Sequence, residues 1–194
     1  MLMKKFVWWS MGIISLAIFL TIGSQPALAG EFTLTSPQMQ AGQQMAMEHV
    51  FNSFGCTGKN ISPELRWSGV PQGTKSLALT VYDPDAPTGS GWWHWLIFNI
   101  NPRTPGLRAN AGDVNAHLAP AGSMQSRTDY GRVGYGGPCP PPGDNPHHYI
   151  FTLFALNVAK LKLDANTPAA MVGFNLNQHA IGKAQMTVLF GREK

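Results

Sequence analysis

Short runs of apolar, β-forming residues alternate along this chain with polar stretches rich in glycine and proline. The runs predict six β-strands, at residues 31–35, 64–67, 76–82, 95–100, 149–158 and 184–190. The stretch from residue 101 to residue 146 has weak periodicity, so we expect long ordered loops there that cover the sheets. The pattern as a whole is typical of a mainly β domain.

One α-helix is predicted near the C-terminus. Thr167 is a typical N-cap, and Pro168 suits the first helical position because the N–H that it lacks would have no partner there. Apolar residues then recur at a spacing of three to four: Met171, Val172, Leu176, Ala180 and Ile181. We expect the helix to end at Gly182, after which the last strand returns to the sheet.

The N-terminal segment, residues 1–29, predicts a cleaved secretory signal peptide. Two lysines precede an apolar stretch at residues 6–22, and Ala27-Leu28-Ala29 forms a small-x-small cleavage site. A retained membrane anchor is the weaker alternative, because the apolar stretch is barely long enough to span a bilayer. Residues 30–194 are then expected to form a single exported domain, periplasmic or secreted, with no further membrane span.

The charge of the chain excludes one class of partner. The sequence carries 14 Lys and Arg residues against 10 Asp and Glu, a formal net charge of +4. Because residues 1–29 hold two lysines and no acidic residue, cleavage lowers this charge to +2. The basic residues stand singly, without the runs and interleaved aromatic residues of a nucleic-acid groove. We therefore expect no nucleic-acid partner, whereas a small anion suits this charge.

Residues 82–95 concentrate polar side chains at the junction between two predicted strands. Asp83 and Asp85 alternate, so an extended chain points both carboxylates the same way, and neighbouring prolines such as Pro87 stiffen the loop. A rigid loop that holds two acids beside His94 predicts a functional site. The alternative is a simple turn in which the aspartates accept backbone hydrogen bonds.

The tryptophans of this segment should divide between two faces of a strand. In extended geometry Trp92 and His94 share one face, and Trp93 and Trp95 share the other. We expect the face that carries His94 to line a site and the opposite face to enter the core.

A second polar segment, residues 134–149, leads into the longest predicted strand. In an extended chain His147 and Tyr149 face one side and His148 faces the other, so an imidazole and a phenol are presented together. Glycines in this segment allow close approach of the backbone to a ligand, and prolines such as Pro140 give a rigid wall. The alternative is a pair of solvated surface histidines.

Three segments together resemble the signature motifs of the phosphatidylethanolamine-binding protein family, and more narrowly its bacterial Raf-kinase-inhibitor-like branch. They are Asp83-Pro84-Asp85-Ala86-Pro87, Gly91-Trp92-Trp93-His94-Trp95, and Pro140-Pro141 through Gly143 to His147 and Tyr149. The likeness extends from about residue 32 to residue 190. It implies an antiparallel β-sandwich with a C-terminal helix and a small anion-binding pocket at one end.

The resemblance also implies a set of ligand-binding residues. By position these are Asp83, Asp85, Pro87, His94, Pro140, His147 and Tyr149. We add Trp92 to this set because it shares a strand face with His94, and Cys139 because it adjoins Pro140. Two positions depart from the eukaryotic branch: Cys139 stands where glycine is common, and His148 stands where arginine often follows the first histidine.

The function implied is binding of phosphate or a phosphorylated head group by an exported protein, regulatory or inhibitory rather than catalytic and without a cofactor. The eukaryotic relatives regulate kinases or transcription complexes, which an exported protein would not meet, so a protein partner is left open. Imidazoles and the phenol of Tyr149 can donate to phosphate oxygens. We expect the aspartates to raise the pKa of the histidines, with burial acting in the opposite direction.

Two other classes of site fit the same residues. His94, His147 and Asp83 form a two-histidine, one-carboxylate set suited to iron or zinc. Alternatively, Cys139 is the nucleophile of a thiol hydrolase with one of the histidines as base, which requires a free thiol. In an exported chain with two cysteines, a disulfide between Cys56 and Cys139 is the expectation that we favour.

Overall fold

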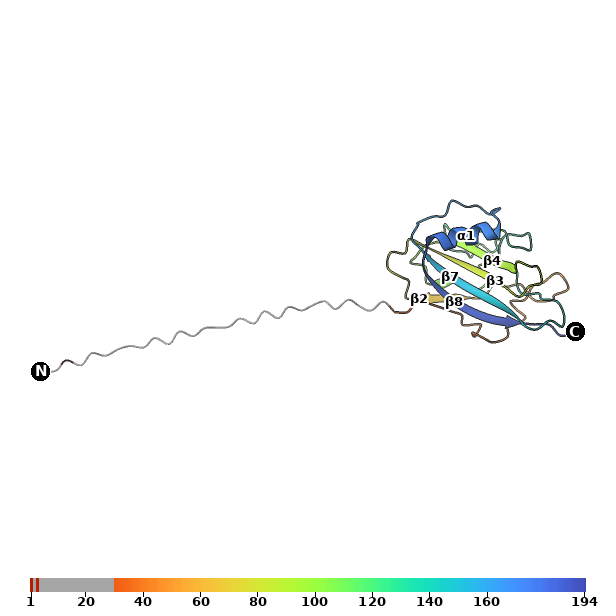
Figure 1. The fold of residues 1–194 in the computed structure, drawn as a ribbon, viewed down its shortest axis with the longest axis horizontal. Helices are drawn as coiled ribbons and strands as arrows, with labels where there is room; N and C mark the ends of the chain where they lie inside the picture. The colour runs from red at the N-terminus through yellow and green to blue at the C-terminus, as the bar shows by residue number, and fades with distance from the viewer. Residues whose placement is uncertain (2, 4–29) are drawn as a thin grey trace.

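The computed structural model describes residues 1, 3 and 30–194, so the predicted signal peptide lies almost entirely outside the described residues. Two antiparallel sheets form the fold (Figure 1). The smaller sheet has the order β1-β2-β5, with bounds Thr33–Thr35, Leu65–Ser68 and Gly106–Leu107. The larger sheet has the order β6-β4-β3-β7-β8, with bounds Met124–Gln125, Trp92–Ile100, Ser76–Asp83, His147–Leu156 and Ala180–Phe190.

All six predicted strands are present, and the mainly antiparallel β fold with one C-terminal helix is confirmed. β4 and β7 begin earlier than predicted, so that Trp92 and His147 are already strand residues. Residues 101–146 contribute only the two-residue strands β5 and β6 and otherwise form loops, as expected. In the part of the chain that the structure describes, no helix is long and apolar enough to cross a bilayer.

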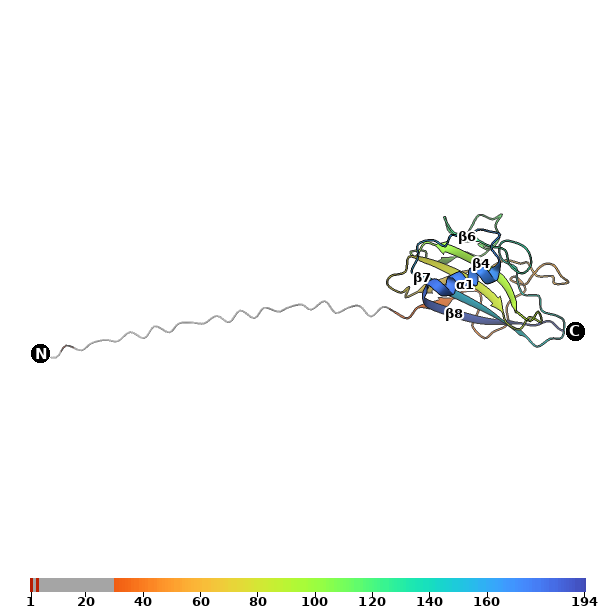
Figure 2. The same cartoon turned by 45° about the horizontal axis from the view of Figure 1, so that its top comes forward.

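The central strands of the larger sheet, β4, β3 and β7, are buried on both faces. The inner face of this sheet packs on the smaller sheet, where side chains such as Leu65, Leu79 and Phe151 form one apolar core. The outer face packs on the helix α1 (Ala169–His179), which Figure 2 shows lying over the sheet between β4 and β8. Because apolar residues are needed on both faces, β3 and β7 are near-continuous apolar runs rather than alternating ones.

The helix departs from its prediction at both ends. Pro168 occupies the N-cap without a side-chain cap bond, while the Thr167 hydroxyl hydrogen-bonds to Asp164. At the other end α1 stops at His179, and the chain enters β8 directly, so Gly182 is a strand residue.

The buried face of the helix also differs from the expected one. Besides Val172 and Leu176, the helix buries Ala169 and Gly173, whereas Met171 is 51% exposed. Gly173 brings the helix onto the Trp93 ring, because a side chain there would start 3.3 Å from that ring. The helix therefore buries a face that is shifted from the one that apolar spacing alone predicted.

A β-bulge near the start of β4 changes the phase of the strand at His94. Val81 pairs with Trp95 and Tyr82 pairs with Trp93, which leaves His94 as an extra residue with no opposite partner on β3. Trp95 therefore enters the core between the sheets, whereas Trp93 packs against the core under α1. The prediction that these two tryptophans share a face is wrong, because alternation cannot reveal an inserted residue.

A disulfide joins Cys56 to Cys139, as the sequence predicted, and the described residues contain no free cysteine. The bond connects the loop that precedes β2 to the loop that leads into β7, across 83 positions of sequence. The two loops are therefore held together where the second of them approaches the end of the larger sheet.

Candidate ligand-binding cavity

The ends of three neighbouring strands meet at one end of the larger sheet. β3 ends at Asp83, where β4 and β7 begin, because both pair antiparallel with it. A cavity of about 170 Å³ lies at this junction. Eight of the residues that line it were predicted from the sequence: Asp83, Pro87, Trp92, His94, Cys139, Pro140, His147 and Tyr149.

The cavity also has lining residues that the sequence reasoning missed. Three of them, Ala86, Thr88 and Pro141, lie inside the two polar segments already singled out. The other two, Phe54 and Tyr130, come from loops with no periodic pattern and no motif. Only the folded arrangement of the loops brings these two aromatic rings to the cavity.

Asp83 is the anchor of the site. Its side chain is buried, and one carboxylate oxygen accepts hydrogen bonds from the backbone N–H groups of Asp85 (2.8 Å) and Ala86 (3.2 Å). The other oxygen lies 2.8 Å from Nδ1 of His147, which is also buried. One carboxylate thus fixes both the loop after β3 and the ring orientation of His147. The positions of the loop and of the ring are therefore coupled to each other.

Asp85 does not line the cavity. Its carboxylate accepts hydrogen bonds from the backbone N–H (2.7 Å) and Nδ1 (2.8 Å) of His148 on the exposed side of β7. Burial acts against ionisation, but these hydrogen bonds outweigh it and lower the pKa of Asp85. The expectation that both carboxylates point the same way is wrong, because the chain turns at Asp83 instead of remaining extended.

His94 is buried with one ring nitrogen satisfied and the other not. Nδ1 lies 2.7 Å from the carbonyl oxygen of Gly136, and since a carbonyl only accepts, Nδ1 must carry the hydrogen. Nε2 is buried and has no partner among the described residues. Burial lowers the pKa of His94 to about 4, although the Gly136 carbonyl and Asp83 act in the opposite direction. For this histidine, burial outweighs the predicted effect of the aspartates.

Two further polar atoms on the cavity walls lack partners. The hydroxyl of Tyr149 and the indole N–H of Trp92 are buried and make no hydrogen bond with any described residue. Burial, together with the charge of Asp83, raises the pKa of Tyr149, so the phenol keeps its hydrogen. Buried groups of this kind are rare in native proteins unless a ligand or water meets them. A fourth such atom, Ser126 Oγ, lies away from this cavity.

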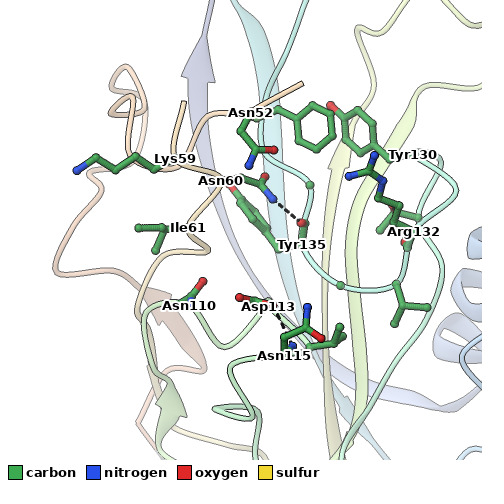
Figure 3. Close-up of a pocket in the computed structure, with 17 residues that line it drawn as sticks. Asn52, Lys59, Asn60, Ile61, Asn110, Asp113, Asn115, Tyr130, Arg132 and Tyr135 are labelled. Carbon is green, nitrogen blue, oxygen red and sulfur yellow. Dashed lines mark hydrogen bonds between the residues drawn. The ribbon is translucent and has the colours of Figure 1, made fainter. Parts of the chain in front are cut away.

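Tyr130 separates the cavity from a second, larger cleft. Its ring stacks on Phe51 at 4.1 Å between ring centroids, and its hydroxyl donates to the Gly137 carbonyl at 2.9 Å. Gly136 permits this position, because a Cβ there would lie 2.4 Å from the Tyr130 ring. On the far side of the ring lies an open cleft of about 450 Å³. Figure 3 shows Tyr130 and Arg132 on one side of this cleft and Lys59 on the other.

The larger cleft lacks the feature that distinguishes the smaller cavity. None of its described lining side chains has a buried polar atom without a partner. The Asn60 amide, which lies at its centre, donates to the Tyr135 carbonyl at 3.1 Å (Figure 3) and accepts from the Gly137 N–H at 2.7 Å. The cleft is larger than the cavity, but the buried polar atoms without partners line the cavity beside His94.

Comparison with known proteins places the chain in a family. Residues 35–191 match the family described as phosphatidylethanolamine-binding protein. The chain belongs to this family. The resemblance drawn from the three sequence segments is thereby confirmed, and the cavity with its two histidines occupies the segments that carried it.

Several bacterial proteins are similar to this chain over most of its length. YbcL of Escherichia coli is 48% identical over 172 residues, which cover 89% of this chain and 92% of YbcL. YbhB of the same organism is 45% identical over 157 residues, 81% of this chain and 98% of YbhB. LppC of Mycobacterium tuberculosis, whose name classes it as a lipoprotein, is 37% identical over 85% of this chain and 75% of its own length.

The fold agrees with that of a solved family member. The crystal structure of E. coli YbcL, described as a new member of the mammalian family, superposes with a TM-score of 0.83 at 49% identity, over 84% of this chain and 100% of that one. The antiparallel sheets and the C-terminal helix are therefore those of the family.

The two alternative chemistries are not favoured in this family member. Cys139 is bonded to Cys56 and has no thiol with which to attack a substrate. Among the described residues, no group of three or more His, Cys, Asp or Glu side chains is arranged to hold a metal ion. The Nδ1 atoms of both cavity histidines are already engaged, His94 with a carbonyl and His147 with Asp83.

Proposed function

We propose that this member of the phosphatidylethanolamine-binding protein family is an exported protein that binds phosphate or a phosphorylated head group. The observation that carries the proposal is a set of three buried polar atoms on one cavity that have no partner in the described part of the chain: Trp92 Nε1, His94 Nε2 and Tyr149 Oη. Leaving such atoms unmet costs about 1 to 3 kcal/mol each. A compact ligand with several oxygen atoms would meet all three at once.

The size of the cavity supports a small polar group. At about 170 Å³ it is smaller than the roughly 300 to 1,000 Å³ typical of pockets that enclose a drug-sized ligand. A single phosphoryl group fits this scale, with the remainder of a larger ligand outside. Phe54, which is 66% exposed beside the cavity, offers an aromatic surface to that remainder.

The arrangement of charges also supports an anionic ligand in spite of the aspartate. The Asp83 carboxylate is already engaged by two backbone N–H groups and by His147. Both of its oxygens are therefore occupied inside the wall, although its negative charge still acts on the cavity. The indole N–H of Trp92 and the phenol of Tyr149 are donors left for the ligand. Pro87 and Pro140 complete a rigid wall, and Asp85 ties its loop to β7 through the backbone N–H of His148, independently of the His148 side chain.

We assign the protein a binding or regulatory role rather than a catalytic one. The hydroxyl of Thr88 is engaged with the Gly91 carbonyl at 2.5 Å, and Cys139 is in the disulfide. Neither the Thr88 hydroxyl nor the Cys139 sulfur is therefore free to attack a substrate. The signal-like segment and the lipoprotein relative LppC support export, and the kinase partners of eukaryotic relatives are not carried over.

Calorimetric titration with inorganic phosphate tests this function. We expect saturable binding at or below millimolar phosphate, and about 10- to 100-fold weaker binding by Tyr149→Phe, which removes only the donor. His148→Gln is the matched control, because His148 faces away from the cavity and should leave the affinity unchanged. Absence of saturable binding by the unmodified protein would rule the proposal out.

A further inference from the structure

The hydrogen-bonding pattern of the cavity is more specific than a general preference for anions. The carbonyl of Gly136 fixes the hydrogen of His94 on Nδ1, so a neutral ring presents a lone pair at Nε2. His94 is 2% exposed, and among the described residues no carboxylate lies at hydrogen-bond distance from its ring to favour a second hydrogen. Toward a ligand, this imidazole is therefore an acceptor and not a donor.

The other two unmet atoms are donors. An indole N–H can only donate, and the Tyr149 phenol keeps its hydrogen because burial raises its pKa. The three cavity atoms thus consist of two donors and one acceptor. A ligand that matches them needs two oxygen atoms that accept and one that carries a hydrogen.

The groups around His94 reinforce this requirement. Its titratable neighbours are Asp83, His147, Tyr130 and Tyr149. Burial and the charge of Asp83 raise the pKa of both tyrosines, so the phenols stay neutral. The Asp83 carboxylate adds negative charge near the cavity, and this charge opposes a ligand oxygen that has no hydrogen.

From this pattern we infer that the cavity selects phosphoryl groups that carry a P–OH hydrogen over anions that lack one. The inference rests on the proposed phosphate-binding function and narrows its substrate class. The ligand's P–OH donates to Nε2 of His94, while two of its other oxygens accept from Trp92 and Tyr149. A ligand oxygen without a hydrogen would be repelled at this position, because its lone pair would face the lone pair on Nε2 of His94.

This requirement divides the available anions clearly. Inorganic phosphate keeps a P–OH in both of its forms near neutral pH. A phosphomonoester has one only as the monoanion, and it loses that hydrogen as the pH rises through about 6. Sulfate and phosphodiesters have none. The head group of an intact phospholipid is a diester, so the cavity should disfavour intact phospholipid and accept free phosphate or monoesters.

Calorimetric titration of the protein distinguishes anions that carry a P–OH hydrogen from anions that lack one. At pH about 7.5 we expect phosphate to bind about 10- to 100-fold more tightly than sulfate. At pH about 5.5, O-phosphoethanolamine should exceed the diester glycerophosphoethanolamine by a similar factor. Above pH about 6, affinity for O-phosphoethanolamine relative to phosphate should fall by up to tenfold per pH unit. Taking the ratio at each pH cancels the titration of the protein's own groups.

Two substitutions at one position separate the acceptor role from a merely structural one. In His94→Asn the amide nitrogen takes the place of Nδ1 and can keep the bond to Gly136, while Nε2 is lost. In His94→Gln the amide group reaches the place of Nε2 and offers a donor there. We expect Gln to bring sulfate within about threefold of phosphate, and Asn to weaken phosphate binding by at least tenfold. His148→Gln should keep the original selectivity.

The state of the imidazole is measurable directly in the unmodified protein. ¹⁵N NMR of the His94 ring in the phosphate complex should show one protonated and one bare nitrogen. A doubly protonated ring, or equal affinities for sulfate and phosphate, would overturn the inference while leaving phosphate binding intact. If phosphate itself does not bind, the proposed phosphate-binding function is wrong. This result differs from equal binding of sulfate and phosphate, which contradicts only the preference for a P–OH hydrogen.

Discussion

Acidification should destabilise the protein through His94. The imidazole is enclosed at the strand junction, where burial disfavours its charged form and lowers its pKa from 6.5 to about 4. In the unfolded chain the same ring gains a proton near pH 6.5. Between these two values the unfolded state binds more protons than the folded state, so stability must fall as the pH falls.

The size of the effect follows from the proton affinities of His94 in the folded and the unfolded state. The stability is fully present above pH about 6.5 and is lost progressively until pH about 4, below which both states are protonated. Each tenfold ratio between the proton affinities of the two states is worth about 1.4 kcal/mol. The loss attributable to His94 alone is therefore on the order of 3 kcal/mol, a large share of the roughly 5 to 15 kcal/mol of a typical domain.

Urea unfolding in phosphate-free buffer, from pH about 7.5 to about 4, measures this loss. His94→Asn is the comparison variant, because it can keep the hydrogen bond to Gly136 and cannot titrate. The difference between the two proteins isolates His94 from the other titrating groups, and His148→Asn controls for removal of an exposed imidazole. Parallel pH profiles for wild type and His94→Asn would refute the assignment of a buried neutral ring.

Three further outcomes follow from the structure. Trp95→Ala should cost about 3 to 5 kcal/mol in denaturant melts because the ring is fully buried, whereas Trp92→Ala should chiefly weaken phosphate binding in titrations; the reverse pattern would contradict the placement of the two rings. Replacing Cys56 and Cys139 together with serine should lower the free energy of unfolding by about 4 kcal/mol, and an unchanged midpoint in guanidinium would count against the constraint. His148→Ala should leave both affinity and stability nearly unchanged, and a clear loss of phosphate affinity would place it in the site.

The sequence predicts the strands and most of the cavity because the signals for them are local. Apolar runs such as residues 76–82 and 149–156 predict a strand from their own residues, without information from distant segments. Each polar segment directly adjoins the end of such a strand. Eight of the nine residues expected in the site line one cavity for this reason. The exception, Asp85, follows a turn that the Asp83 carboxylate creates by accepting two N–H groups, which strand alternation does not describe.

What the sequence does not predict depends on pairing between distant segments. The bulge at His94 exists only with respect to β3, so no pattern within β4 could reveal it. Tyr130 reaches the cavity because its ring stacks on Phe51, which is far from it in sequence. The direction of the His94 pKa shift also depends on how deeply the ring is buried, because burial and the aspartates act in opposite directions. The sequence does not give this burial.

The bulge at His94 gives β4 two segments that can change independently. Ahead of it, Trp92 belongs to the cavity; after it, Trp95 and Ile97 belong to the core between the sheets. Because the inserted residue absorbs the change of phase, exchanges at positions 92 and 94 need not disturb the pairing that starts at Trp95. Ligand preference in this family member can therefore diverge, in evolution or in engineering, without a compensating redesign of the interior.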